Sequence, residues 1–440
     1  MHYEPKAPKR LSEVGYESNL VLQLIGKGMY QENLETALQF SNALKLPTNV
    51  VEEALQVLTN RKQIESVGMT NNSANGMGTL RYILTTAGKN FVQDALNQNH
   101  YFGPAPVPLD AYCHQVREQA IGNERVSPED IEKSFSDIVV PAEFTRQLGP
   151  AVNSGMSILI YGPAGNGKTT VAEKVAHIFE SVVYIPHAIE VNGAIIKIFD
   201  SSVHTSLETE APAEERRSLI REMVDKRFVP CKRPVVTTGG ELNLEMLDLK
   251  FNEISKFYEA PLHIKALNGT FIIDDFGRQQ VSPEELLNRW IVPLQSRIDF
   301  LKLHSGKSFE IPFDELVIFS TNLAPNDLMD PAFLRRIPYK LETKDPSLEA
   351  FKAIYNGVAR KEGFELTDEI FDFTVRQITE VSEKSLAAYQ PKFIIDQVKA
   401  ACKYQGAPLS FTKEYVAEGL ANLYVQDSTF QGQVGMTPKN

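Results

Sequence analysis

An eight-residue string at positions 162–169 constrains what this 440-residue chain can fold into more than any other feature. The string fits the pattern G-x-x-x-x-G-K-[ST] and consists of Gly162, Pro163, Ala164, Gly165, Asn166, Gly167, Lys168 and Thr169. The apolar run 157–161 precedes it, and residues 170–179 follow it with apolar side chains at helical spacing. A strand, a glycine-rich turn and a helix in this order predict a loop that binds phosphate groups.

The residue types in this phosphate loop suit that task. Glycines let backbone N–H groups turn toward phosphate oxygens, because no side chain stands in the way. Lys168 is expected to reach the β- and γ-phosphates of a nucleotide, the Thr169 hydroxyl to bind Mg²⁺, and Thr170 to contact the nucleotide beside them. A chance match to the pattern is the alternative, and the predicted strand and helix on either side count against it.

Two adjacent acids, Asp274 and Asp275, follow the apolar run 270–273. The carboxyl ends of parallel strands meet at one edge of a sheet, so these acids are expected beside the phosphate loop. Asp274 would then hold Mg²⁺ through water, and Asp275 would orient or deprotonate the attacking water. The alternative is a pair of acids that caps the helix after the strand.

Strand-like and helical runs alternate between residues 157 and 341, which predicts an α/β domain with a parallel sheet. The five candidate strands are residues 157–161, 182–185, 270–274, 316–321 and 338–341. Residues 347 to about 423 are predicted to be helical throughout, and the polar end 426–440 is predicted to be disordered.

The first hundred residues predict a smaller, mostly helical unit. Behind a loose tail at 1–10, the order helix, helix, turn, helix, strand, polar segment, strand, helix resembles a winged helix-turn-helix over residues 11–100. Thr48 is expected to cap the third helix, and Thr85 or Thr86 the last. Residues 101–126 begin with a proline-rich stretch that cannot be helical up to Asp110, and they are interpreted as a linker.

From about residue 127 to 425 the chain resembles the AAA+ ATPases. The phosphate loop, the acidic strand and a strand that ends in Thr321 and Asn322 occur in the order found in that family. The resemblance implies a large α/β subdomain at 127–346, a helical lid at 347–425, and ATP and Mg²⁺ as cofactors. It also implies that Asn322 occupies the sensor-1 position, where a polar side chain positions the water.

The segment 330–336 resembles the arginine-finger segment of this family. There, such an arginine contacts the γ-phosphate that a neighbouring subunit holds. The resemblance therefore implies a homo-oligomeric ring, commonly a hexamer, with Arg335 or Arg336 as the finger. The alternative is that these arginines pair with surface acids.

Two positions depart from the family pattern. Lys392 stands where the sensor-2 arginine is usual, and lysine keeps the charge but lacks the planar fork of donors. Asp275 stands where glutamate is usual, and its shorter side chain could misplace the water. The alternative is that Lys392 is an ordinary first-turn surface residue.

Residues 300–311 alternate on both sides of a Ser-Gly turn and predict a β-hairpin. A helix over 282–298 leads into it, with a capping box at Ser282 and Trp290 in the core. A hairpin before sensor 1 resembles the branch with MoxR-like ATPases, Lon- and ClpX-type unfoldases and bacterial enhancer-binding proteins. This resemblance implies that His304 and Lys307 face the ring pore and grip a partner, whereas a solvated turn is the alternative.

More than seventy residues separate the second predicted strand from Asp274. Residues 233–248 within this insertion predict a second hairpin or a loop, which would line the pore or bind a partner. A basic run within it is interpreted as a solvated helix face and comprises Arg216, Arg217, Arg221, Lys226 and Arg227.

Charge bears on the partner that this chain acts on. The net charge is −11, and residues 1–120 hold ten Lys or Arg against eleven Asp or Glu. Glu52 and Glu53 open the helix that would have to approach DNA phosphates. We therefore expect a ring-forming remodelling ATPase whose N-terminal domain chooses a protein partner. The alternatives are a DNA-associated ATPase that binds through the winged helix and a slow nucleotide switch.

Apolar runs and cysteine spacing bear on the cellular compartment of the protein. No apolar run approaches the ~18 residues that a membrane helix needs, and the first ten residues do not resemble a signal peptide. Three cysteines lie far apart, without the spacing of a metal site or a disulfide framework. These features predict a cytoplasmic protein with no membrane span.

Overall fold

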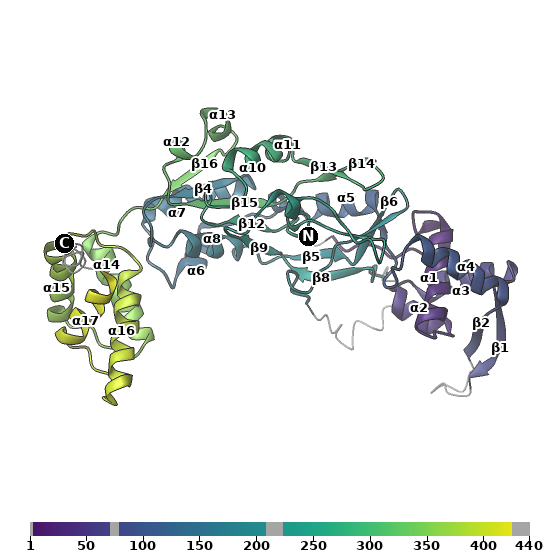
Figure 1. Cartoon of the computed structure of the whole chain (residues 1–440), viewed down its shortest axis with the longest axis horizontal. Coiled ribbons are helices and arrows are strands. Elements are labelled where there is room, and N and C mark those ends of the chain that lie inside the picture. The colour runs from purple at the N-terminus through teal and green to yellow at the C-terminus, as the bar shows by residue number, and fades with distance from the viewer. Residues whose placement is uncertain (1–2, 71–78, 208–222, 425–440) are drawn as a thin grey trace, which may run out of the picture.

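The computed structural model describes residues 3–70, 79–207 and 223–424, which form an elongated molecule with sheets in its middle (Figure 1). Four helices gather at one end and pack around one core. They are α14 (Leu348–Lys361), α15 (Asp368–Arg376), α16 (Gln390–Gln405) and α17 (Lys413–Leu423). The predicted disordered end at 426–440 lies outside the described residues.

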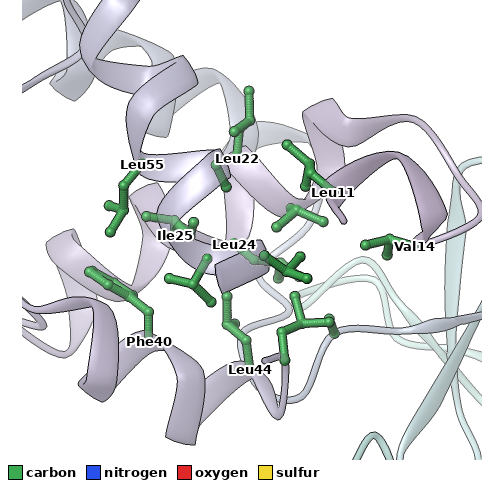
Figure 2. Close-up of a cluster of buried hydrophobic side chains, with 14 of the residues drawn as sticks. Leu11, Val14, Leu22, Leu24, Ile25, Phe40, Leu44 and Leu55 are labelled. Carbon is green, nitrogen blue, oxygen red and sulfur yellow. The ribbon is translucent and has the colours of Figure 1, made fainter. Parts of the chain in front are cut away.

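The N-terminal unit lies at the other end and has the predicted order of elements. It comprises α1 (Ser18–Gln31), α2 (Ala37–Leu44), α3 (Thr48–Asn60), β1 (Ile64–Thr70), β2 (Thr79–Leu84) and α4 (Thr86–Gln98). Its core joins Leu22 and Ile25 of α1 to Phe40 of α2 and Leu55 of α3 (Figure 2). The winged-helix character of this unit stays a prediction.

Two local expectations for this region, the Thr48 cap and the loose tail, need correction, and the Thr85 cap is confirmed. Pro47 precedes α3 without a capping side chain, Thr48 is the first helical residue, and the Thr48 hydroxyl donates to Ser41 Oγ at 3.3 Å. Thr85 caps α4 by accepting from the N–H of Gly88. The tail is held at residues 5–7, which pair with residues 223–225, a distant partner that no local pattern reveals.

Lys27 of α1 is fully buried in this unit. Its ammonium donates to Asn99 Oδ1 at 2.8 Å and to the Tyr101 carbonyl at 3.3 Å. Burial lowers the pKa of this lysine to about 8. In the unfolded chain the pKa returns to the ordinary value, so the folded chain binds fewer protons between these two values.

The stability of the chain should therefore rise as the pH rises from about 8 toward the ordinary lysine pKa. Lys27→Met removes the titrating group and with it this rise, which corresponds to ~3 kcal/mol at its limit. Between pH 7.5 and pH 10, the melting temperature of the wild type should rise by several degrees relative to that of the variant. A constant difference between the two melting temperatures would contradict this.

Five parallel strands form the central sheet: β16 (Tyr339–Glu342), β4 (Ile158–Tyr161), β15 (Leu316–Thr321), β12 (Thr270–Ile273) and β9 (Val235–Thr238). Numbered by their order along the chain, the strands that lie side by side are the fifth, first, fourth, third and second. One face packs on α6 (Pro128–Phe135), α7 (Ala142–Ser154) and α8 (Lys168–Ala176). The other face packs on α10 (Pro283–Arg289) and α11 (Ile291–Ser296). With the phosphate loop between β4 and α8 and the C-terminal helices, this is the predicted parallel α/β sheet of P-loop type with a helical C-terminal unit.

The second predicted strand does not belong to this sheet. Residues 182–185 do form a strand, β5 (Val182–Pro186), but it pairs antiparallel with β8 (Phe228–Lys232) outside the central sheet. In chain order, the second strand of the central sheet is β9, which lies inside the segment predicted to be a hairpin or loop. An apolar run indicates a strand, whereas only long-range pairing decides which sheet it joins.

The insertion and the predicted linker form a second, mixed sheet. Its strands are β10 (Lys250–Phe251), β11 (Tyr258–Glu259), β7 (Ala194–Lys197), β6 (Ala188–Val191) and β3 (Val107–Pro108). Helix α5 (Leu109–Glu118) follows β3. The stretch predicted to be non-helical up to Asp110 therefore ends at Pro108, two residues earlier. Arg227 does not lie on a solvated helix: it is buried and bonded to Asp225. Arg216, Arg217 and Arg221 lie outside the described residues.

The predicted hairpin is present as β13 (Ile298–Lys302) and β14 (Ser308–Pro312). The helix before it is two helices that break at Trp290, because Pro293 has no N–H to continue the first helix. Trp290 is buried, as expected. At the tip, the His304 ring stacks on Phe251 of the second sheet, with ring centroids 5.2 Å apart.

Candidate nucleotide-binding site

The phosphate loop joins β4 to the N-terminus of α8. Gly162 has φ +142°, and a Cβ there would lie 2.1 Å from the Thr343 carbonyl oxygen. Gly165 and Gly167 also have positive φ values. The loop conformation therefore favours glycine at all three positions, and the contact with Thr343 excludes any larger residue at Gly162.

Lys168 begins α8 and points into this loop. Its ammonium donates to the carbonyl oxygens of Gly162 at 3.0 Å and Pro163 at 2.8 Å. Burial lowers the pKa of Lys168, and the nearby charges of Asp274 and Asp275 oppose that effect. Among the described residues, the hydrogen bonds of this buried cation go to two neutral carbonyls, which phosphate oxygens can replace.

Thr169 and Asp274 meet at the same edge of the sheet. The Thr169 hydroxyl donates to Asp274 Oδ2 at 2.8 Å. Hydroxyl and carboxylate oxygens are ligands that Mg²⁺ accepts. Within the described ranges, no cluster of three or more His, Cys, Asp or Glu side chains is arranged to hold a metal. These two residues thus fit a Mg²⁺ that takes its other ligands from phosphate and water.

Asp275 and Asn322 are brought together from adjacent strands. Asn322 Nδ2 donates to Asp275 Oδ1 at 3.1 Å. Asp275 has φ +48°, an uncommon conformation for a residue other than glycine. Gln279 stabilises this turn by donating to the carbonyls of Asp274 and Asp275, at 2.9 and 3.2 Å. Sequence reasoning missed Gln279, because nothing in a lone glutamine after the acids signals such a role.

The two candidate finger arginines differ in their surroundings. They follow α13 (Pro331–Leu334). Arg336 Nη1 donates to the Ala332 carbonyl at 2.8 Å, and its guanidinium lies 5.5 Å from the centre of the Phe333 ring. Arg335 is exposed. Neither forms an ion pair with an acid in the part of the chain that the structure describes, which leaves the Arg335 guanidinium available.

Lys392 does not contact the phosphate loop. It is exposed in the first turn of α16 and pairs with Asp396, one turn along the same helix, at 3.2 Å. This matches the description as a surface residue, and the sensor-2 role stays a prediction. Thr170, the last predicted nucleotide contact, lines a cavity beside α8.

Residues just before Lys392 contact the loop instead. The Tyr389 N–H donates to the Gly165 carbonyl at 3.0 Å, and a Cβ on Gly165 would lie 2.2 Å from the Tyr389 ring. Asn166 Oδ1 accepts from the Ala388 N–H at 3.1 Å, and its Nδ2 donates to Asp345 at 2.8 Å. The C-terminal helices are therefore tied directly to the phosphate loop, a link that sequence reasoning missed.

Asn166→Ala removes both side-chain bonds of this link. We expect the Ala388 amide to exchange with deuterium at least tenfold faster in the variant, because it loses its acceptor. Asp345→Asn is the matched control, since it keeps an oxygen acceptor for the Asn166 amide. Hydrogen exchange measured on peptides that span residues 383–390 tests this, and equal rates in wild type and Asn166→Ala would argue against it.

Comparison with known proteins finds limited likeness. Residues 347–422 match a family described as "Domain of unknown function (DUF8689)". No curated protein matches the chain significantly. Among the described residues, no helix is long and apolar enough to cross a membrane.

Several solved structures are similar in fold. The Thermotoga maritima RuvB Holliday junction branch migration motor is 16% identical, with a TM-score of 0.34, over 71% of this chain and 74% of that one. NtrX from Brucella abortus is 12% identical, with a TM-score of 0.40, over 79% and 70%. Domain III of the T. maritima replication initiation protein DnaA is 14% identical, with a TM-score of 0.37, over 67% and 98%. None of these similarities says what this chain binds.

Proposed function

We propose that this chain binds ATP with Mg²⁺ and hydrolyses it, as a ring-forming ATPase that remodels a protein partner. The observation that carries the proposal is the meeting of three features at one sheet edge. These are the Lys168 ammonium inside the loop, the Thr169–Asp274 bond and the Asn322–Asp275 bond. Phosphoryl transfer needs such positioned charges more than covalent chemistry.

Each residue has a distinct task in this mechanism. The loop backbone and Lys168 bind and orient the phosphates. Thr169 and Asp274 would hold Mg²⁺, which would supply positive charge beside the phosphate oxygens. Asp275 accepts a proton from the attacking water, and Asn322 holds the Asp275 carboxylate in position. Arg335 of a neighbouring subunit would stabilise the γ-phosphate in the transition state.

The proposed mechanism gives each segment of the chain a role. Residues 127–346 would carry the site, residues 347–425 would respond to nucleotide through the link at Asn166 and Tyr389, and residues 11–100 would select the partner. A slow switch is the second candidate. It is favoured by the side chain of Asp275, which is shorter than glutamate and already bonded to Asn322.

Titration calorimetry with ATP and Mg²⁺ tests the core of the proposal. Lys168→Ala should weaken ATP binding by ~100-fold, because charge-assisted bonds to phosphate are lost. Lys133→Ala is a matched control, since Lys133 is exposed and paired only with Glu180 on the surface. Unchanged affinity in Lys168→Ala, or an equal loss in both variants, would remove the basis for a nucleotide site in this loop.

A further inference from the structure

The turn that follows β12 carries Asp275 in a left-handed backbone conformation. Asp275 has φ +48°, and a residue with a side chain keeps such a conformation only where its surroundings impose it. In this conformation the exposed Asp275 carboxylate accepts from Asn322 Nδ2 at 3.1 Å. The position of the carboxylate therefore depends on the groups that hold the turn.

Gln279 holds this turn through the three hydrogen bonds of one side-chain amide. Its Nε2 donates to the carbonyl oxygens of Asp274 at 2.9 Å and Asp275 at 3.2 Å, and its Oε1 accepts from the Gly277 N–H at 2.8 Å. A side-chain amide offers donors and an acceptor side by side, which neither a carboxylate nor an ammonium does. The bond to the Asp275 carbonyl fixes the peptide group directly after this residue.

The next residue, Phe276, is fixed to the neighbouring strand β15. The Phe276 N–H donates to the Ser320 carbonyl at 2.7 Å, and the Thr321 hydroxyl donates to the Phe276 carbonyl at 2.8 Å. The Phe276 side chain is buried. Asn322 follows Thr321 directly in the chain. One end of the turn is thereby tied to the strand that leads to Asn322, and Gln279 closes the other end.

We propose that Gln279 is a positioning residue for ATP hydrolysis, which acts through Asp275 rather than through a contact of its own with the nucleotide. Its Nε2 is already engaged by two carbonyls of the turn. These bonds keep the Asp275 carboxylate beside Asn322, where it can accept the proton of the attacking water. Without them, the turn would relax toward an ordinary backbone conformation and carry the carboxylate away from Asn322. The inference rests on the function proposed above, because it concerns the same hydrolytic step.

Single-turnover hydrolysis and titration calorimetry with ATP and Mg²⁺ test this on the full chain. Gln279→Ala removes all three bonds, whereas Gln279→Glu keeps an acceptor for the Gly277 N–H but lacks both donors. Gln280→Ala is the matched control, because the side chain of Gln280 is exposed and forms no hydrogen bond with a described residue.

We expect Gln279→Ala and Gln279→Glu to lower the hydrolysis rate by about a hundredfold, the loss that a misplaced reacting group can cause. ATP affinity should stay within about twofold of that of the wild type, and Gln280→Ala should hydrolyse ATP at the wild-type rate. In an Asp275→Asn background, Gln279→Ala should cause less than about a threefold further loss, because the group that Gln279 positions no longer accepts a proton. A residue that only stabilises the fold would lower the rate equally in both backgrounds.

Unchanged hydrolysis by Gln279→Ala, or an equal loss in the two backgrounds, would overturn the inference and leave the proposed hydrolysis in place. A loss of ATP affinity as large as the loss of rate would assign Gln279 to binding and overturn it too. A wild type that binds ATP without hydrolysing it would overturn the proposed function and the inference together. Should Gln279→Ala fail to fold, Gln279→Glu decides alone, and a wild-type rate in that variant would overturn the inference.

Discussion

Asp275→Asn should lower ATP turnover by about a thousandfold or more and leave ATP affinity within about twofold. Asparagine has the shape of aspartate and can keep a bond to Asn322, but it cannot accept the proton of the attacking water. The loss therefore falls on the chemical step rather than on binding. Single-turnover hydrolysis and calorimetry on the same preparation separate the two quantities.

Asp275→Glu is the matched variant for this position. It keeps the carboxylate and lengthens it by one methylene toward the usual family residue, so turnover should equal or exceed that of the wild type. A faster Asp275→Glu variant would also identify the short side chain as the cause of slow hydrolysis, as in the switch alternative. Near wild-type turnover in Asp275→Asn would mean that another group activates the water.

Arg335→Ala should lower turnover by about a thousandfold, the effect expected when a finger arginine is lost. Arg336→Ala should lower it much less, because the Arg336 guanidinium is already engaged by the Ala332 carbonyl and the Phe333 ring. The two adjacent arginines thus serve as each other's control. Turnover per subunit, measured over a range of protein concentrations, should rise steeply for wild type and remain flat for Arg335→Ala.

A mixing experiment identifies the subunit that supplies the arginine. Lys168→Ala disables the loop of its own subunit but keeps Arg335, whereas Arg335→Ala keeps an intact loop. A mixture of the two should hydrolyse ATP faster than either alone, since one subunit can complete the site of the other. No gain on mixing would argue that the site is complete within one chain, and equal losses in Arg335→Ala and Arg336→Ala would count against a specific finger.

The parts of the site that depend on adjacent residues could be predicted from the sequence. The phosphate loop is contiguous, and the positive φ values of Gly162, Gly165 and Gly167 are a local backbone property that favours glycine. The apolar run that ends in two acids predicts Asp274 at the edge of the sheet, whereas the role of Asn322 is implied by the resemblance to the AAA+ ATPases. Their meeting with Thr169 and Asp275 then follows from the shared edge of a parallel sheet.

The parts that depend on distant contacts could not be predicted. The apolar runs at 182–185 and 235–238 both predict strands, and only pairing with β12 decides that β9 joins the central sheet. The link of Asn166 to Ala388 and Asp345 joins residues far apart in the chain, so no local pattern indicates it.

The sequence by itself determined the chemistry of the loop, because φ values, capping and apolar periodicity act over a few residues. The tertiary structure alone decided which strand is the edge of the sheet and which helix end contacts the loop. It also decided which of two adjacent arginines is left unengaged. These outcomes depend on burial and hydrogen bonding between segments separated by scores of residues, which local preferences do not encode.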